Sequence, residues 1–183
     1  DVVCSPLLDL RLPGAHEVIG DRAFSADPAE VARLGAAWMR GLHAAGCIPV
    51  IKHIPGHGRA TLDSHEALPR VEASAEDLAA DVAPFRALAG CGAWAMTAHI
   101  VYPAWDARLP ATLSGTVIDG VIRGEIGFDG VLLSDDLAMG AMRGLSNDVA
   151  SAAVAAGCDL VLHCTGVPEE TAAVLQGCPW VSE

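Results

Sequence analysis

The stretch CIPVIKHIPGHGRATLDSH, residues 47–65, decides the fold that we expect for this chain. Its beginning, Cys47 to Ile51, is an apolar run of the kind that forms a buried strand. The remainder, Lys52 to His65, is a polar loop that holds basic side chains, a carboxylate and three histidines around a proline and two glycines. In α/β proteins, loops at the ends of buried strands usually carry the chemistry. We therefore expect this loop to form part of a functional site.

The same pattern of a short apolar run, a polar loop and an amphipathic stretch recurs along the chain. Strict alternation of strands and helices, with strands that are apolar throughout, predicts a parallel sheet covered by helices. The expected strands are residues 2–10, 48–51, 93–98, 131–134 and 160–163, and the expected helices are residues 28–45, 74–90, 114–126, 149–156 and 169–175.

Two of these helices have clear start signals. Ser25 or Asp27 can cap the first helix, with Pro28 at its first position, and the run from Ser74 to Asp77 starts the second with acidic residues in the first turn. Each has apolar residues at helical spacing, which predicts the face that it buries. These residues are Val31, Leu34, Ala37, Trp38 and Leu42 in the first helix, and Leu78, Val82, Phe85 and Leu88 in the second.

Polar residues collect after the expected strands, a bias that is typical of a (β/α) barrel or a doubly wound sheet. A GxGxxG motif or P-loop follows none of these strands, so a nucleotide-binding sheet is less favoured. Because a complete barrel usually needs ~250 residues, we expect residues 1–183 to form a single domain that is an incomplete (β/α)8 TIM barrel of about five β/α units. The polar residues are Asp9, Arg22, residues 52–65, His99, Asp135, Asp136 and His163.

The composition limits the possible partners. The chain has 183 residues, of which 52% are hydrophobic, with a mean hydropathy of +0.38, as in a globular protein with a sizeable core. Its net charge of −12 excludes a basic face for nucleic acid and argues against an anionic membrane surface. We expect a small substrate, no nucleic acid, no membrane and no cofactor.

The six cysteines are scattered without a CxxC pair, which favours free thiols in a reducing cytoplasm over a disulfide framework or a zinc ribbon. We see no signal peptide and no apolar run of the ~20 residues that a membrane span needs. The chain begins without Met at Asp1 and stops where a further strand could begin, so we expect it to be truncated at both ends.

Three interpretations of the polar loop compete. His53, His57 and His65 could bind a metal ion, but the prolines and glycines between them forbid a helical metal motif. Residues 55–58 could be a tight turn whose histidines satisfy backbone groups, which is the better interpretation of His57. Finally, Asp63 lies two residues before His65, so the carboxylate could orient the imidazole and raise its proton affinity in a general acid/base dyad.

Asp135 is the second candidate for chemistry because it directly follows the apolar run 131–134. A helix cap is the alternative role, which Asp136 could equally fill. One carboxylate that attacks and one group that donates a proton are the minimum that a retaining glycosidase requires. A cation such as Arg22 or Lys52 would bind sugar hydroxyls or carboxylates.

Taken together, these residues resemble glycoside hydrolase family 3, and most closely its bacterial β-N-acetylglucosaminidase (β-N-acetylhexosaminidase) branch. The resemblance covers nearly all of the chain in the right order. It rests on KHIPGHG at 52–58 with DSH at 63–65 and LP at 68–69, and on PLLD at 6–9, IGDRAF at 19–24, AHIVYP at 98–103 and GFDGVLLSDDLAM at 127–139.

The resemblance implies a TIM-barrel enzyme that removes terminal β-linked N-acetylglucosamine with retention, through a covalent glycosyl-enzyme. It implies Asp135 as nucleophile and His65 as acid/base, with Asp63 as its partner. The implied substrate is a muropeptide, N-acetylglucosamine linked to anhydro-N-acetylmuramyl peptide, met during cytoplasmic cell-wall recycling. The resemblance also implies three sugar-binding residues, Arg22, Lys52 and His53.

Two alternatives remain open. The chain could be an inactive fragment or a non-catalytic remnant of the fold, because strands at both ends of the family's barrel have no counterpart in it. It could also have another family 3 specificity, such as that of a β-glucosidase. His65 argues against the second alternative, since the resemblance associates the Asp-Ser-His loop with the N-acetylglucosaminidase branch.

Overall fold

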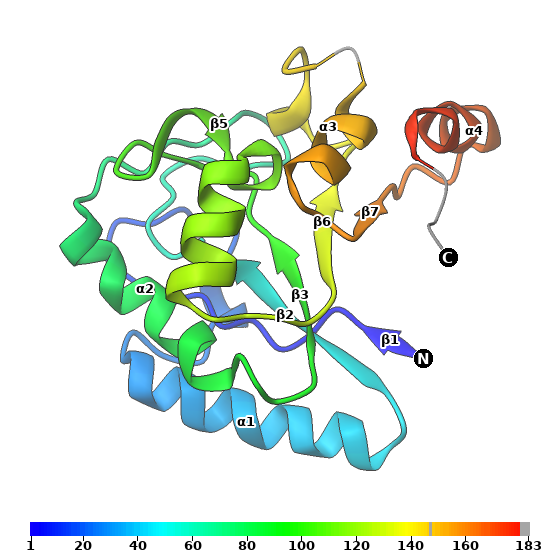
Figure 1. Cartoon of the computed structure of the whole chain (residues 1–183). Helices are drawn as coiled ribbons and strands as arrows, with labels where there is room; N and C mark the ends of the chain where they lie inside the picture. Colours follow the sequence, from blue (N-terminus) through cyan, green and yellow to red (C-terminus); the bar gives the residue numbers. More distant parts are fainter. Residues whose placement is uncertain (147, 180–183) are drawn as a thin grey trace.

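The computed structural model describes residues 1–146 and 148–179, and its centre is a curved sheet of five parallel strands (Figure 1). Each strand pairs with the next parallel strand along the chain, in the order β1-β2-β3-β6-β7. A doubly wound sheet would reverse its order at a switch point, whereas a continuous order is that of a (β/α)8 barrel. The sheet is therefore half of such a barrel. Its strands are β1 (Val2–Val3), β2 (Ile48–Ile54), β3 (Trp94–Thr97), β6 (Leu132–Asp136) and β7 (Leu160–Leu162).

The helices follow the strands as the alternation predicts, and α1 and α2 pack side by side against the sheet (Figure 1). The sequence analysis did not predict the small antiparallel hairpin of β4 (Val101–Tyr102) and β5 (Asp106–Pro110). The helices are α1 (Pro28–Ala44), α2 (Ala75–Leu88), α3 (Val149–Ala156) and α4 (Pro168–Gly177), with the wide π-type helix η3 (Thr116–Glu125) and the short turns η1 (Gly20–Arg22), η2 (Ala111–Leu113) and η4 (Gly140–Met142). Within the described residues, none of these helices has the length and apolar character that a bilayer span requires.

The predicted strand 2–10 is interrupted. Only Val2–Val3 pairs regularly with β2, and an isolated bridge between Leu7 and Lys52 resumes the pairing. Pro6 lies in the gap, where it has no N–H to donate to a neighbouring strand. The direction of the predicted strand is correct, but its continuity is not.

Strand β2 is longer than predicted and contains three residues that the sequence assigned to the loop, residues 52–54. Lys52 pairs with Met96 and Ile54 with Thr97, so His53 is the extra residue of a bulge. The Lys52–His53 and Ile54–Pro55 peptide bonds are both cis. The first polar residues, Lys52 and His53, therefore belong to the strand, and pairing with β3 holds their backbone in place.

Helix α1 begins as expected, with the Asp27 carboxylate accepting the Ala29 N–H at 2.9 Å, but its predicted buried face is only partly correct. The helix buries Val31, Gly35 and Met39, and Trp38 is 51% exposed. The reason is close approach, because a Cβ at Gly35 would lie 2.6 Å from the Leu8 side chain. The helix therefore contacts the core along the face that contains Gly35, and Trp38 lies outside that face.

Helix α2 agrees with the prediction in detail. Ser74 and Asp77 form a reciprocal capping box, which satisfies free N–H groups of the first turn. The predicted residues Leu78, Val82 and Phe85 are each 1% exposed or less and Leu88 is 5% exposed. They join the main core, in which the helices cover the outer side of the sheet.

Replacement of Leu78 by alanine should destabilise the protein by about 2–5 kcal/mol, because it leaves a cavity in a close-packed core. The matched control is Leu175→Ala in α4, where the leucine is 66% exposed; this change should stay within about 0.5 kcal/mol. Urea unfolding monitored by circular dichroism measures both. Equal effects of the two substitutions would contradict the assigned core.

Candidate active site

A fully buried carboxylate, Asp9, organises the polar end of β2. Its Oδ1 accepts the backbone N–H of His57 at 2.7 Å and that of His53 at 3.1 Å. Its Oδ2 lies 2.7 Å from Nδ1 of the His53 ring. A charge taken out of water needs such partners. Asp9 therefore ties the bulge at His53 to the turn that follows it.

The partners of Asp9 also determine its protonation. Burial alone would raise the pKa of Asp9, but the charge and hydrogen bond of the His53 ring, with the charge and N–H of His57, outweigh burial and lower the pKa below its usual value. The carboxylate is therefore ionised at neutral pH. The sequence analysis recorded Asp9 as polar and did not assign it to the site, because its partners lie 44 and 48 residues away.

The turn after β2 is packed too closely for other residue types. A Cβ at Gly58 would lie 2.3 Å from the carbonyl oxygen of Leu10, and Gly56 has a φ of +140°. The hydroxyl of the buried Tyr102 donates to the Gly56 carbonyl oxygen at 2.7 Å. This close packing agrees with the interpretation of residues 55–58 as a tight turn.

His57 lies inside this turn. Its Nε2 is 3.3 Å from Ser64 Oγ, and among the described residues its Nδ1 has no hydrogen-bond partner. Burial, together with the nearby charge of His53, lowers the pKa of His57 to about 4. The imidazole is therefore neutral at pH 7.

His53 brings two strands together. With Nδ1 held by Asp9, its Nε2 lies 3.8 Å from Oδ2 of Asp135 at the end of β6. The Asp135 side chain is 17% exposed, and its Oδ1 accepts the N–H of Asp136 at 2.8 Å. Strand β6 also has an irregular register here. The carboxylate of Asp135 is thus partly exposed, and it faces the ring of His53, which Asp9 holds in place.

Asp63 and His65 form the pair that their spacing predicts. Asp63 Oδ1 accepts the His65 backbone N–H at 2.8 Å and lies 2.7 Å from Nδ1 of the ring. The His65 side chain is 63% exposed and that of Asp63 is 22% exposed. Burial would raise the pKa of Asp63, but the N–H, the ring hydrogen bond and the charge of His65 lower it overall. An ionised Asp63 therefore orients His65 with Nε2 left free for a ligand.

The two predicted cations are placed differently. Lys52 is half-buried in β2, and among the described residues its ammonium forms no ion pair. Arg22 lies on the surface turn η1, where its guanidinium donates to the carbonyl oxygen of Val18. Arg22 forms no hydrogen bond with the other candidate residues within the described part of the chain.

Another buried histidine, His99, connects the ends of β3 and β6. Its Nδ1 is 2.7 Å from Thr112 Oγ1 and its Nε2 is 3.0 Å from the Asp136 carbonyl oxygen. Burial lowers the pKa of His99 despite the raising effect of the Asp135 charge. Its place after a strand was visible in the sequence, but its bond to the residue that follows Asp135 was not.

The three histidines of the loop have separate partners. The His53 and His57 ring centroids are 5.4 Å apart, but His65 is paired with Asp63. In residues 1–146 and 148–179, no group of three or more acidic, histidine or cysteine side chains could hold a metal ion. The geometry does not favour the metal interpretation of the loop.

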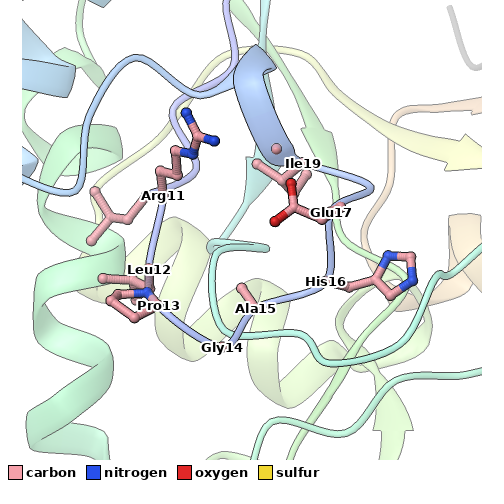
Figure 2. Close-up of a pocket in the computed structure, with 10 residues that line it drawn as sticks. Arg11, Leu12, Pro13, Gly14, Ala15, His16, Glu17 and Ile19 are labelled. Atoms are coloured by element: carbon pink, nitrogen blue, oxygen red, sulfur yellow. The ribbon is translucent and has the colours of Figure 1, made fainter.

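The candidate residues do not line three cavities found in the described part of the chain. One cavity of about 260 Å³ lies within the loop from Leu10 to Gly20, and Figure 2 shows this loop curving around it. A second cavity lies beside Arg59 and Arg70. A third lies between the segment after β6 and α4. Asp135 and His65 lie outside all three. The candidate site is identified by the chemistry of its side chains rather than by an enclosed pocket.

The comparisons with known proteins agree with this arrangement. Residues 1–178 match the family model described as the glycosyl hydrolase family 3 N terminal domain. The chain is 46% identical over 183 residues to the beta-hexosaminidase of Alkalilimnicola ehrlichii, a match that covers 98% of the chain and 52% of that relative. The chain thus spans about half the length of the curated relatives that it matches.

Solved structures give the same result. A family 3 beta-N-acetylglucosaminidase from Paenibacillus sp. superposes with a TM-score of 0.89 at 41% identity, over 97% of this chain and 34% of that one. NagZ from Neisseria gonorrhoeae, in complex with N-trifluoroacetyl-D-glucosamine, superposes with a TM-score of 0.86 at 40% identity, over 100% of this chain and 52% of that one.

Asp9→Asn should destabilise the protein by about 3 kcal/mol, since it removes a buried charge and directs an NH₂ group at N–H donors. Asp129→Asn, in an exposed turn, is the matched control and should change little. Guanidinium unfolding at pH 7 measures both changes. Wild-type stability of Asp9→Asn would show that the buried carboxylate is not the anchor described above.

Stability should fall as the pH decreases from about 6.5 towards 4, because unfolded His57 binds a proton in this range and the folded, buried ring does not. Between pH 7 and pH 5 its contribution amounts to about 2 kcal/mol. His57→Gln cannot take up the proton and should flatten the pH dependence by that amount in urea titrations at the two values. An unchanged slope in the variant would refute the assignment.

Proposed function

The chain belongs to glycosyl hydrolase family 3, and on that basis we propose that residues 1–183 form a single, partial TIM-barrel catalytic domain of a retaining β-N-acetylglucosaminidase. The names of its relatives, beta-hexosaminidase and beta-N-acetylglucosaminidase, support this activity. The observation that carries the proposal is the arrangement of two groups. An imidazole oriented by a carboxylate lies on the loop after β2, and a second carboxylate ends β6.

In this proposal Asp135 is the nucleophile. Its carboxylate oxygen attacks the anomeric carbon while the bond to the leaving oxygen breaks, which gives a covalent glycosyl-enzyme. The position of Asp135 supports the role, because its side chain is partly exposed at the carboxyl end of a parallel strand. Nε2 of His53, 3.8 Å from its Oδ2, lies on the same side of the site.

His65 is the proposed acid/base. In the first step it gives its Nε2 proton to the leaving oxygen. In the second step it takes a proton from the water that attacks the anomeric carbon, and Asp135 leaves as a carboxylate. Asp63 holds Nδ1 of the ring at 2.7 Å, which leaves Nε2 to face the substrate.

Three residues are proposed to bind the sugar. Lys52 and His53 lie at the polar end of β2, where the His53 ring faces Asp135. As donors they can bind hydroxyl groups of the terminal residue. Arg22 lies on a separate loop, and its role requires that the sugar reach η1.

We extend the proposal to the substrate class that the family resemblance implies, N-acetylglucosamine linked to anhydro-N-acetylmuramyl peptides from the cell wall. The reaction would take place in the cytoplasm during cell-wall recycling. The six free cysteines of the chain are compatible with that reducing compartment.

The protein as produced by its gene should hydrolyse p-nitrophenyl N-acetyl-β-D-glucosaminide with retention, as observed by NMR of the first-formed product. Asp135→Ala should lower kcat by about 10⁴-fold. A fluorinated N-acetylglucosaminide with a good leaving group should label the peptide that contains Asp135, as read by mass spectrometry.

Asp129→Asn serves as the control for that experiment and should keep full activity. A folded Asp135→Ala protein with the wild-type rate would refute the nucleophile. A β-glucoside cleaved faster than the N-acetylglucosaminide would refute the specificity, and a folded wild-type protein without activity on either would favour a non-catalytic role.

A further inference from the structure

The loop that carries His65 is bonded to the segment that follows Asp135. The N–H of Gly140 donates to the His65 carbonyl oxygen at 2.9 Å, and the N–H of Ala141 donates to the Ser64 carbonyl oxygen at 3.1 Å. These two hydrogen bonds connect residues that are about 75 positions apart in the chain. They join the two β/α units that supply the proposed acid/base and the proposed nucleophile.

The contact is so close that only glycine fits at position 140. A Cβ there would lie 2.4 Å from the Glu66 carbonyl oxygen and 2.6 Å from that of His65. Gly140 is not among the glycines with positive φ, so its backbone conformation would admit other residues. Space, rather than conformation, therefore requires glycine at this position.

The segment on the nucleophile's side is held firmly. The N–H of Leu137 donates to the Leu162 carbonyl oxygen at 2.9 Å, and the N–H of Ala138 donates to Asp136 Oδ1 at 3.0 Å. The N–H of Met139 donates to the Asp136 carbonyl oxygen at 3.1 Å. Gly140 is thus linked to the end of β6 by a short, hydrogen-bonded path.

The loop on the acid/base side has a matching anchor in Ser64. This residue is 3% exposed, and its hydroxyl lies 3.3 Å from Nε2 of His57. The neighbouring His65 side chain, by contrast, is 63% exposed. The backbone of the loop is therefore fixed on both sides while the imidazole projects from it.

We infer that Gly140 is a positioning residue that sets the place of the Asp63–His65 dyad relative to Asp135. The inference rests on the proposed function and adds a residue to it. An added methyl group at position 140 would push the carbonyl oxygens of His65 and Glu66 away and displace the imidazole. General acid/base catalysis depends on hydrogen-bond reach, so this displacement should impair proton transfer and leave the nucleophile in place.

The test compares Gly140→Ala with Gly120→Ala, in which the added methyl group meets nothing within 4 Å. For 4-methoxyphenyl N-acetyl-β-D-glucosaminide, whose leaving group needs a proton, kcat/KM of Gly140→Ala should fall by about 10-fold or more. For the 2,4-dinitrophenyl glycoside, which needs no proton, kcat/KM should change by less than about 3-fold. Azide, a nucleophile that needs no general base, should restore kcat on the dinitrophenyl substrate.

Hydrogen exchange provides a measurement that needs no variant. In the wild-type protein the amides of Gly140 and Ala141 should be protected, and in Gly140→Ala the amides of residues 63–67 should exchange faster. Unprotected amides in the wild type would overturn the inference, whether or not the variant folds. Equal losses on both substrates would also overturn it, because they would indicate general damage rather than displaced proton transfer.

The outcomes separate the two proposals. A folded wild-type protein that cleaves neither aryl glycoside contradicts the proposed function, and with it the positioning role that rests on it. An active wild-type protein whose Gly140→Ala variant keeps the wild-type dependence on the leaving group contradicts only the role of Gly140.

Discussion

The site depends on one buried charge, the carboxylate of Asp9. This carboxylate accepts hydrogen bonds from the backbone N–H groups of His53 and His57, and it lies within hydrogen-bond distance of Nδ1 of the His53 ring. Without these partners the ion would be costly to bury, and without the ion the N–H groups would be unsatisfied. This mutual dependence holds His53 with one nitrogen on Asp9 and the other facing Asp135.

Irregular pairing at the ends of two strands orients other side chains of the site, those of His53 and Asp135. Strands β2 and β6 each lose regular register at their polar ends, at His53 and near Asp135. A bulge re-directs a side chain and bends its strand, and bulges are common next to active sites. Both irregularities lie at the carboxyl ends of their strands. Residues that are far apart in the sequence therefore converge at that end of the sheet.

Much of the fold could be predicted from the sequence, because the order of the elements follows from apolar runs and helix caps. The failures have physical causes. The buried face of α1 was only partly predictable from hydrophobicity, because Gly35, a residue without a side chain, is buried on it so close to Leu8 that a Cβ would not fit. The Asp63–His65 pair was predictable because it is local, whereas the partners of Asp9 are far away in sequence.

The hydrogen bonds between the loop of Asp63 and His65 and the segment after β6 join main-chain groups. Every residue type offers the same carbonyl oxygen and, proline excepted, the same N–H, so side chains at loop positions such as Glu66 can vary without disturbing the contact. A change in loop length would instead move every carbonyl oxygen out of register with its donor. Apart from Asp63, Ser64 and His65, evolution of this loop is therefore expected to be permissive in residue identity and strict in the number of residues.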